Sequence, residues 1–157
     1  MAEDLHITAS SKAEKYQQLY PQIKSLLEGE TDSIANMANV CAALKFGMTF
    51  FWVGFYLIKN NELVLGPFQG PIACTRISKG KGVCGTAWKK NDVIIVDDVD
   101  QFPGHISCSS LSKSEIVLPF YNSKNEIIGV LDVDSENYKS FDETDKEWLK
   151  KILLLLN

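Results

Sequence analysis

The segment from Thr49 to Ile58, TFFWVGFYLI, consists almost entirely of aromatic, aliphatic and β-branched residues, and this composition predicts a buried strand. Residues 59–61, Lys-Asn-Asn, predict a turn, and residues 62–65 are the expected return strand. Strands joined by tight turns pair antiparallel. The middle of the chain therefore predicts an antiparallel sheet, whose further strands we expect at 93–96, 116–121 and 126–133, the last two joined by the turn 122–125.

Helical patterns flank this strand-rich middle on both sides. Ser11-x-x-Glu14 is a capping-box pattern, and apolar residues follow it at helical spacing up to Leu27. Pro21 predicts either a kink in this helix or its true beginning. A second helix is expected from Thr31 to about Gly47, and Ser140-x-x-Glu143 predicts the cap of a last one. Helices at both ends that pack on one face of a sheet of about six strands make an α+β domain.

The bulk composition excludes several classes of function. The chain has 157 residues, which favours a single domain over 1–157, and its net charge of −4 gives no electrostatic footprint for nucleic acid or for an anionic membrane. Its N-terminus lacks the basic start and apolar core of a signal peptide, and no apolar run reaches the roughly 20 residues of a membrane span. We expect a cytoplasmic protein, in which four cysteines indicate packing, metal binding or redox chemistry.

Three of the four cysteines lie in long loops, predicted over 66–85 and 97–112, that are rich in turn-forming residues. Cys74, Cys84 and Cys108 are therefore expected to be accessible, so that one could act as a nucleophile and the others could resolve what it forms. Cys41 lies on an apolar helical face and is expected in the core. The alternatives are three unreactive residues, or a zinc site completed by His105, although the spacings of 10 and 24 residues are unlike common zinc motifs.

A group of acidic residues surrounds the expected end of the sheet. Asp132 and Asp134 alternate along a strand and so point to one face, about 7 Å apart, and Glu115 begins the neighbouring strand. Such a cluster could hold an ammonium group, and repulsion within it would raise one pKa and provide a proton donor. The alternative is a solvent-exposed strand end. Asp97 and Asp98 end another strand, and one of them could also face this site.

Trp52 and Tyr56 lie four residues apart on a strand and so share a face. They fit either an ordinary core or the apolar wall of a binding site, where a thioether sulfur packs well against rings. Gly80, Gly82 and Gly85 predict tight turns whose backbone amides could bind a carboxylate.

Several of these segments together resemble the free methionine-(R)-sulfoxide reductases, which are single-domain GAF-fold enzymes. The resemblance rests on seven stretches: GPFQG (66–70), Cys74, KGVCGTA (81–87), VDDV (96–99), FPGHISC (102–108), SEIVLP (114–119) and GVLDVDS (129–135). The similarity as a whole runs from IANMANV (34–40) to FDETD (141–145), which is nearly the whole chain.

The resemblance implies an enzyme without a cofactor or metal that reduces free L-methionine-(R)-sulfoxide to L-methionine. It places the nucleophile at Cys108 and the resolving cysteine at Cys84 or Cys74, with Cys84 preferred, and it implies thioredoxin as the reductant. Glu115, Asp132 and Asp134 match the acidic cluster that holds the substrate, and Trp52 and Tyr56 match the wall around its methyl group; Asp97 joins these candidates.

Two expectations go with this assignment. Family members are often dimers, and the apolar terminal helices make a homodimer plausible. A non-catalytic GAF-type module that senses a small molecule or an oxidant is the competing interpretation.

Overall fold

The computed structural model describes residues 4–106 and 108–157. Its elements follow in the order α1 (Lys12–Leu27), α2 (Ser33–Met48), β1 (Trp52–Lys59), β2 (Glu62–Gln69), β3 (Arg76–Ser78), α3 (Gly82–Lys90), β4 (Ile94–Val96), the 3-10 turn η1 (Val99–Gln101), β5 (Ser114–Tyr121), β6 (Ile127–Ser135) and α4 (Glu143–Leu154). The strands form one sheet in the order β3-β2-β1-β6-β5-β4, in which every neighbouring pair is antiparallel. The predicted α+β class and sheet of about six strands are confirmed.

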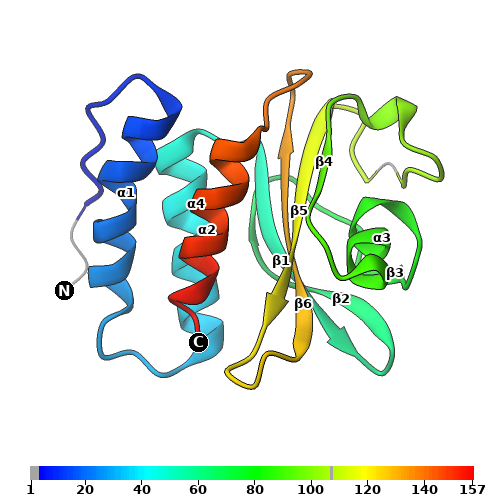
Figure 1. Ribbon diagram of the computed structural model, residues 1–157, viewed down its shortest axis with the longest axis horizontal. Helices are drawn as coiled ribbons and strands as arrows, with labels where there is room; N and C mark the ends of the chain where they lie inside the picture. Colours follow the sequence, from blue (N-terminus) through cyan, green and yellow to red (C-terminus); the bar gives the residue numbers. More distant parts are fainter. Residues whose placement is uncertain (1–3, 107) are drawn as a thin grey trace.

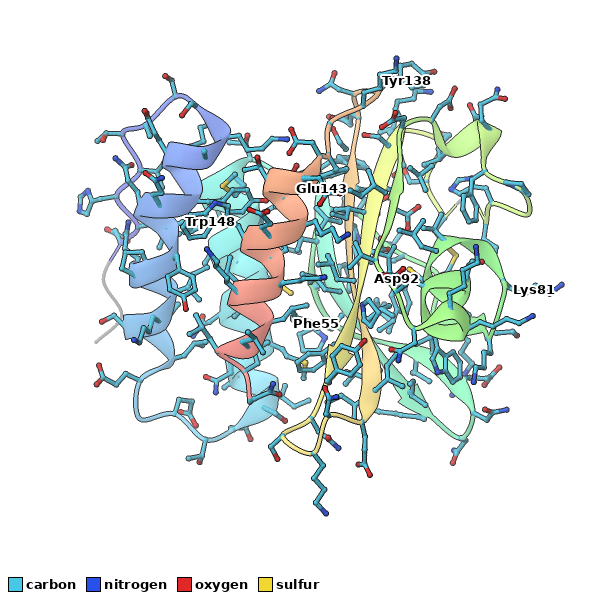
Figure 2. All side chains as sticks on the ribbon, viewed as in Figure 1. Phe55, Lys81, Asp92, Tyr138, Glu143 and Trp148 are labelled. Atoms are coloured by element: carbon cyan, nitrogen blue, oxygen red, sulfur yellow. A yellow bond between two sulfur atoms is a disulfide. The ribbon has the colours of Figure 1, made fainter. Side chains whose placement is uncertain are left out.

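The sheet is covered on both faces. On one face, α2 and α4 lie next to the sheet and α1 packs on their outer side, and these three form the helix layer; α3 lies on the other face with the irregular segments around it (Figure 1). Side chains alternate between these two sides, so Val53 and Phe55 of β1 join the core beneath the helix layer, whereas Trp52 and Tyr56 join a second cluster with α3. Figure 2 shows Phe55 in the space between the sheet and the helices. A cavity opens on the side of the sheet that carries this second cluster.

The element boundaries differ from the sequence expectations where local signals compete. Strand β2 continues to Gln69, and α3 begins at Gly82, so part of the expected 66–85 loop is regular structure. Pro21 lies inside α1, which runs unbroken through it. The cap of α4 is Asp142, whose side chain accepts from Thr144 N, with Asp145 completing the capping box in place of the expected Ser140 and Glu143.

No helix in the described part of the chain has the length and apolar character needed to cross a bilayer.

A buried carboxylate joins the first and last helices. Asp145 is fully buried, and it accepts hydrogen bonds from the Tyr16 hydroxyl at 2.7 Å and from Lys12 Nζ at 2.6 Å. It also accepts from Asp142 N at 2.9 Å. The Tyr16 ring stacks on Trp148, with the ring centroids 6.0 Å apart, and Figure 2 shows Trp148 between α1 and α4. Because removing one partner of such a network leaves the other groups unsatisfied, Asp145 sets the docking of α1 on α4.

We predict that Asp145→Ala lowers the free energy of unfolding by about 3 kcal/mol, because the buried Tyr16 hydroxyl and the partly exposed Lys12 lose their carboxylate acceptor. Urea denaturation of the purified variant measures this. The matched control is Glu143→Ala on the same helix, whose ion pair with Lys146 is exposed and should contribute less than about 1 kcal/mol. Equal losses in the two variants would contradict the role given to Asp145.

Candidate active site

A small cavity, open to solvent on one side, lies on the face of the sheet opposite the helix layer. Strands β1, β5 and β6 form its floor. Three segments form its walls: the β2–β3 connection at 71–73, the start of α3, and residues 105–106 and 108–112 before β5. The cavity thus joins the two loops that carry the candidate cysteines to the strands that carry the candidate acids.

Strand pairing places the acids in register. Asp134 of β6 is paired with Trp52 of β1 on one side and with Glu115 of β5 on the other, so these three form one row across the sheet. Asp132 lies two residues along β6 and therefore on the same face. All four side chains line the cavity. The same-face expectation for Asp132 and Asp134 agrees with this register, and Glu115 joins them through strand pairing between distant parts of the chain.

Aromatic residues of β1 form the wall beside the acids. Trp52 stacks with Tyr56 and with Phe68, at centroid distances of 6.1 and 5.3 Å. Gly54 makes the flat position of Trp52 possible, because a Cβ there would lie 2.5 Å from the Trp52 ring and 2.4 Å from Phe68 Cβ. Trp52 and Tyr56 line the cavity, so they form part of its wall as well as part of the core.

The polar ends of the same two aromatic residues hold a wall segment. The Tyr56 hydroxyl donates to the carbonyl oxygen of Cys74 at 2.8 Å, and Trp52 Nε1 donates to that of Pro71 at 3.0 Å. These bonds fasten the β2–β3 connection to the sheet. The backbone of Cys74 is therefore held by residues of the binding wall.

The carboxyl groups are strongly perturbed by burial. Glu115 is 6% exposed and Asp132 is 7% exposed. Loss of hydration, followed by repulsion from the other two acids, raises the pKa of Glu115 well above its ordinary value. Burial also raises the pKa of Asp132 to about 6, and burial together with Asp132 raises the pKa of Asp134.

This cluster has no cationic partner in the described part of the chain. The ion pairs there involve other residues, and the buried Oδ1 of Asp132 has no hydrogen-bond partner among the described residues. An incoming cation would therefore be attracted to this end of the cavity, since it would lower the cost of ionising the buried acids.

The cysteine pairing differs from the expected one. A disulfide joins Cys74 to Cys108 across 34 residues of chain, with their Cα atoms 5.5 Å apart. Cys84, the preferred partner, carries a free thiol. Cys108 is exposed and Cys74 is partly exposed, so the bond lies at the surface of the cavity. The resemblance left Cys84 and Cys74 both open as partners of Cys108, and the structure pairs Cys108 with Cys74 and not with the preferred Cys84.

Cys84 lies deeper in the cavity, against the acids. Its thiol is 4% exposed, and Sγ lies 3.9 Å from Glu115 Oε1, to which it donates. Burial, and then the nearby acids Asp132 and Glu115, raise the pKa of this thiol well above its ordinary value. Cys84 is therefore held as a neutral thiol, which is a poor nucleophile. Cys41 is buried beneath the helix layer, as the sequence predicts, and burial raises its pKa to about 12.

The remaining candidates lie at different distances from the cavity. His105 lines it, and burial lowers the pKa of its imidazole. Asp97 is exposed and is not among the lining residues; its carbonyl oxygen accepts from Lys139 N. Asp98 caps the turn η1 through Asp100 N. The structure thus separates Asp97 from the other candidates, because the strand that it follows ends at the sheet edge.

Several lining residues were absent from the sequence prediction. Phe51, Ile72, Ile106 and Ser112 line the cavity from loops or strand ends. No local pattern marks such positions, since their role depends on how the loops fold over the sheet. The start of α3 was expected only as a glycine-rich turn. Residues 81–84 there line the cavity, and Lys81 provides no side-chain hydrogen bond to cap the helix.

Comparison with known proteins places these features in context. The sequence model of the GAF domain matches residues 37–154. GAF domain-containing protein A of Dictyostelium discoideum is 65% identical over 158 residues, which are 100% of this chain and 99% of that protein. Free methionine-R-sulfoxide reductase of Saccharomyces cerevisiae is 39% identical over 163 residues, which are 97% of this chain and 91% of that enzyme. The structure of free methionine-R-sulfoxide reductase from Neisseria meningitidis, in complex with its substrate, gives a TM-score of 0.95 at 52% identity and covers 99% of this chain and 93% of that one.

We predict that alkylation of the native, oxidised protein modifies none of its four cysteines rapidly, because two are in the disulfide and Cys41 and Cys84 are buried. Mild reduction should then make Cys74 and Cys108 reactive, with Cys108 the faster since it is exposed. Peptide mapping by mass spectrometry identifies the modified residues. A cross-linked peptide that joins Cys84 to Cys108 would show that the pairing is different.

Proposed function

The chain belongs to the GAF-domain family and, within it, to the free methionine-R-sulfoxide reductases, and from this premise we propose that it reduces free L-methionine-R-sulfoxide with Cys108 as nucleophile and Cys74 as resolving thiol. The observation that carries this proposal is the Cys74–Cys108 disulfide beside a cavity that is lined by Cys108 and by the acids Glu115, Asp132 and Asp134. The disulfide can exchange electrons, and the acids can bind a charged amino acid.

The redox step balances with these two thiols. The thiolate of Cys108 attacks the sulfinyl sulfur, an acid protonates the sulfinyl oxygen, and the oxygen passes to Cys108 as the sulfur–oxygen bond of the substrate breaks. The products are methionine and a sulfenic acid at Cys108. The Cys74 thiol then attacks the Cys108 sulfur and hydroxide leaves as water, which forms the disulfide. The two electrons gained by the substrate come from the two thiols.

The acidic cluster explains a preference for the free amino acid. Glu115, Asp132 and Asp134 offer three carboxyl groups around one point. Burial raises their pKa values, and repulsion between the acids adds to this for Glu115 and Asp134, so an ammonium group would stabilise the charged forms. A methionine residue inside a protein has no ammonium group. One of the same acids, protonated because its pKa is raised, is also suited to give the proton to the sulfinyl oxygen.

Trp52 and Tyr56 are the proposed contacts of the substrate methyl group, because their stacked rings offer an apolar wall for a thioether. Gly82 and Val83 line the cavity at the start of α3, and their backbone amides are the proposed contacts of the substrate carboxylate. Cys84 is assigned to substrate binding through Glu115 instead of to electron transfer, since its thiol is buried and its pKa is raised.

We further propose that thioredoxin, an external dithiol protein, reduces the disulfide. Cys108 is exposed, so its sulfur can be reached by an attacking thiolate, and Ile72 beside the cavity is 91% exposed and offers an apolar contact for a protein. A homodimer through the terminal helices remains a prediction; Leu154 at the end of α4 is 68% exposed and is available for such a contact.

The first test is methionine formation from the R and S epimers of free methionine sulfoxide, with thioredoxin, its reductase and NADPH. We expect turnover of the R epimer only. Cys108→Ser should form no methionine, and Cys74→Ser should form about one methionine per enzyme because sulfenic acid forms but is not resolved. Cys84→Ser should retain multiple turnover. A folded wild-type protein that reduces neither epimer would leave a binding or sensing domain, and a Cys74→Ser variant that still turns over with thioredoxin would remove Cys74 from the resolving role.

A second prediction concerns the ammonium group. Glu115→Gln should raise KM for the free amino acid by about 10- to 100-fold, the equivalent of one charge-assisted hydrogen bond, with a smaller change in kcat. N-acetyl-methionine-R-sulfoxide, which has no charge on nitrogen, should be a poor substrate of the wild type and should lose little more in the variant. The matched control is Glu136→Gln, an exposed acid just beyond β6, which should leave KM unchanged. Equal KM values for wild type and Glu115→Gln would exclude this role.

A further inference from the structure

The acidic end of the cavity includes a group that an ammonium site does not need. A buried thiol, Cys84 Sγ, lies among the carboxylates, and one ligand atom from each of Cys84, Glu115 and Asp132 lies within 4.8 Å of the others. All three residues are at least nine-tenths buried. A sulfur and two carboxylate oxygens that converge at buried residues are a typical donor set for a divalent metal ion of borderline softness.

A second observation separates this cluster from an ordinary group of acids. Asp132 is 93% buried, and its Oδ1 has no hydrogen-bond partner among the residues that the structure describes. An unsatisfied buried carboxylate oxygen is costly unless something else binds it. A cation held between Asp132, Glu115 and Cys84 would satisfy it.

We propose that Cys84, Glu115 and Asp132 bind one divalent ion of the zinc class (Zn²⁺, Co²⁺ or Cd²⁺) in the same end of the cavity. Around a tetrahedral ion, with bonds of about 2.3 Å to sulfur and about 2.1 Å to oxygen, a sulfur and an oxygen ligand lie about 3.6 Å apart. The observed distance between Cys84 Sγ and Glu115 Oε1 is 3.9 Å, so side-chain movements of a few tenths of an ångström bring them into range. The thiol proton is released to solvent as the ion binds.

The backbone supports such a site without large movement. Glu115 and Asp132 come from the paired strands β5 and β6, and Cys84 comes from the first turn of α3, which packs on these strands. Ligands on regular elements hold their positions better than ligands on loops. The fourth position faces the open cavity, where water or Asp134, which lines the same end, could complete the coordination.

The donor set favours the zinc class over the hard cations. Ca²⁺ and Mg²⁺ need six or more oxygen ligands and have little affinity for sulfur, whereas Zn²⁺ is commonly four-coordinate with thiolate and carboxylate ligands. The ion would occupy the place assigned to the substrate ammonium and would compete with it. This competition rests on the proposed function, but the binding of the ion does not.

The test uses Co²⁺ as a spectroscopic probe on the full chain with the Cys74–Cys108 disulfide intact. Under these conditions Cys41 and Cys84 are the free thiols, so a thiolate-to-cobalt charge-transfer band must come from one of them. We expect one Co²⁺ per chain, a near-ultraviolet charge-transfer band and tetrahedral visible bands. Zn²⁺ should displace the cobalt, and Mg²⁺ should not.

Two cysteine variants assign the band to its residue. Cys84→Ser should lose the charge-transfer band, and the matched variant Cys41→Ser should keep it. Glu115→Gln should weaken cobalt binding by at least about tenfold, and it serves as a second variant in case Cys84→Ser does not fold. Absence of the band in the wild type, or its persistence in folded Cys84→Ser, would overturn the proposal.

Methionine formation in the presence of Zn²⁺ tests the consequence separately. Zn²⁺ should raise KM for the sulfoxide without lowering kcat. Cobalt binding to a protein that proves inactive would support the metal site while rejecting the reductase function, whereas an active enzyme without the cobalt band would do the reverse.

Discussion

The pairing of β1, β6 and β5 is the constraint on which the rest of the structure depends. These central strands are covered on both faces, so each alternate residue must enter one of two buried environments. One set of side chains is apolar and meets the helix layer. The other set includes Trp52, Glu115, Asp132 and Asp134, and its strand register alone brings them into one cavity. A shift of one residue in any of these pairings would exchange the two sets and remove both the core and the site.

Burying the acids costs free energy, and the apolar core on the helix side of the sheet offsets this cost. Buried carboxyl groups without a cation are unfavourable, and the pKa values of Glu115, Asp132 and Asp134 rise because the folded state disfavours their charged forms. The large apolar core between the sheet and α1, α2 and α4 stabilises the fold independently of the cavity. Unfavourable burial of charged groups is typical of binding sites, because a ligand that stabilises the buried charge binds in preference to one that does not.

The two loops supply the reactive sulfurs, and the sheet holds one of these loops in place. Tyr56 and Trp52 donate hydrogen bonds to the β2–β3 connection, which carries Cys74, so the binding wall and the position of the resolving thiol are parts of one arrangement. The difference between Cys84 and Cys108 is one of environment. Cys108 is at the surface, whereas Cys84 is buried among carboxyl groups that disfavour its thiolate.

The sequence by itself determined the secondary structure classes, the α+β architecture and the residue types of the site. Strand alternation predicted that Asp132 and Asp134 share a face, because side-chain direction in a strand depends only on local backbone geometry. The family could also be recognised from the sequence, because each of its motifs is a contiguous stretch of residues. Only the tertiary structure decided that Cys108 pairs with Cys74 instead of Cys84, that Asp97 lies outside the cavity, and that Phe51, Ile72, Ile106 and Ser112 line it. Those outcomes depend on how loops distant in sequence fold over the sheet, and neither periodicity nor spacing along the chain carries that information.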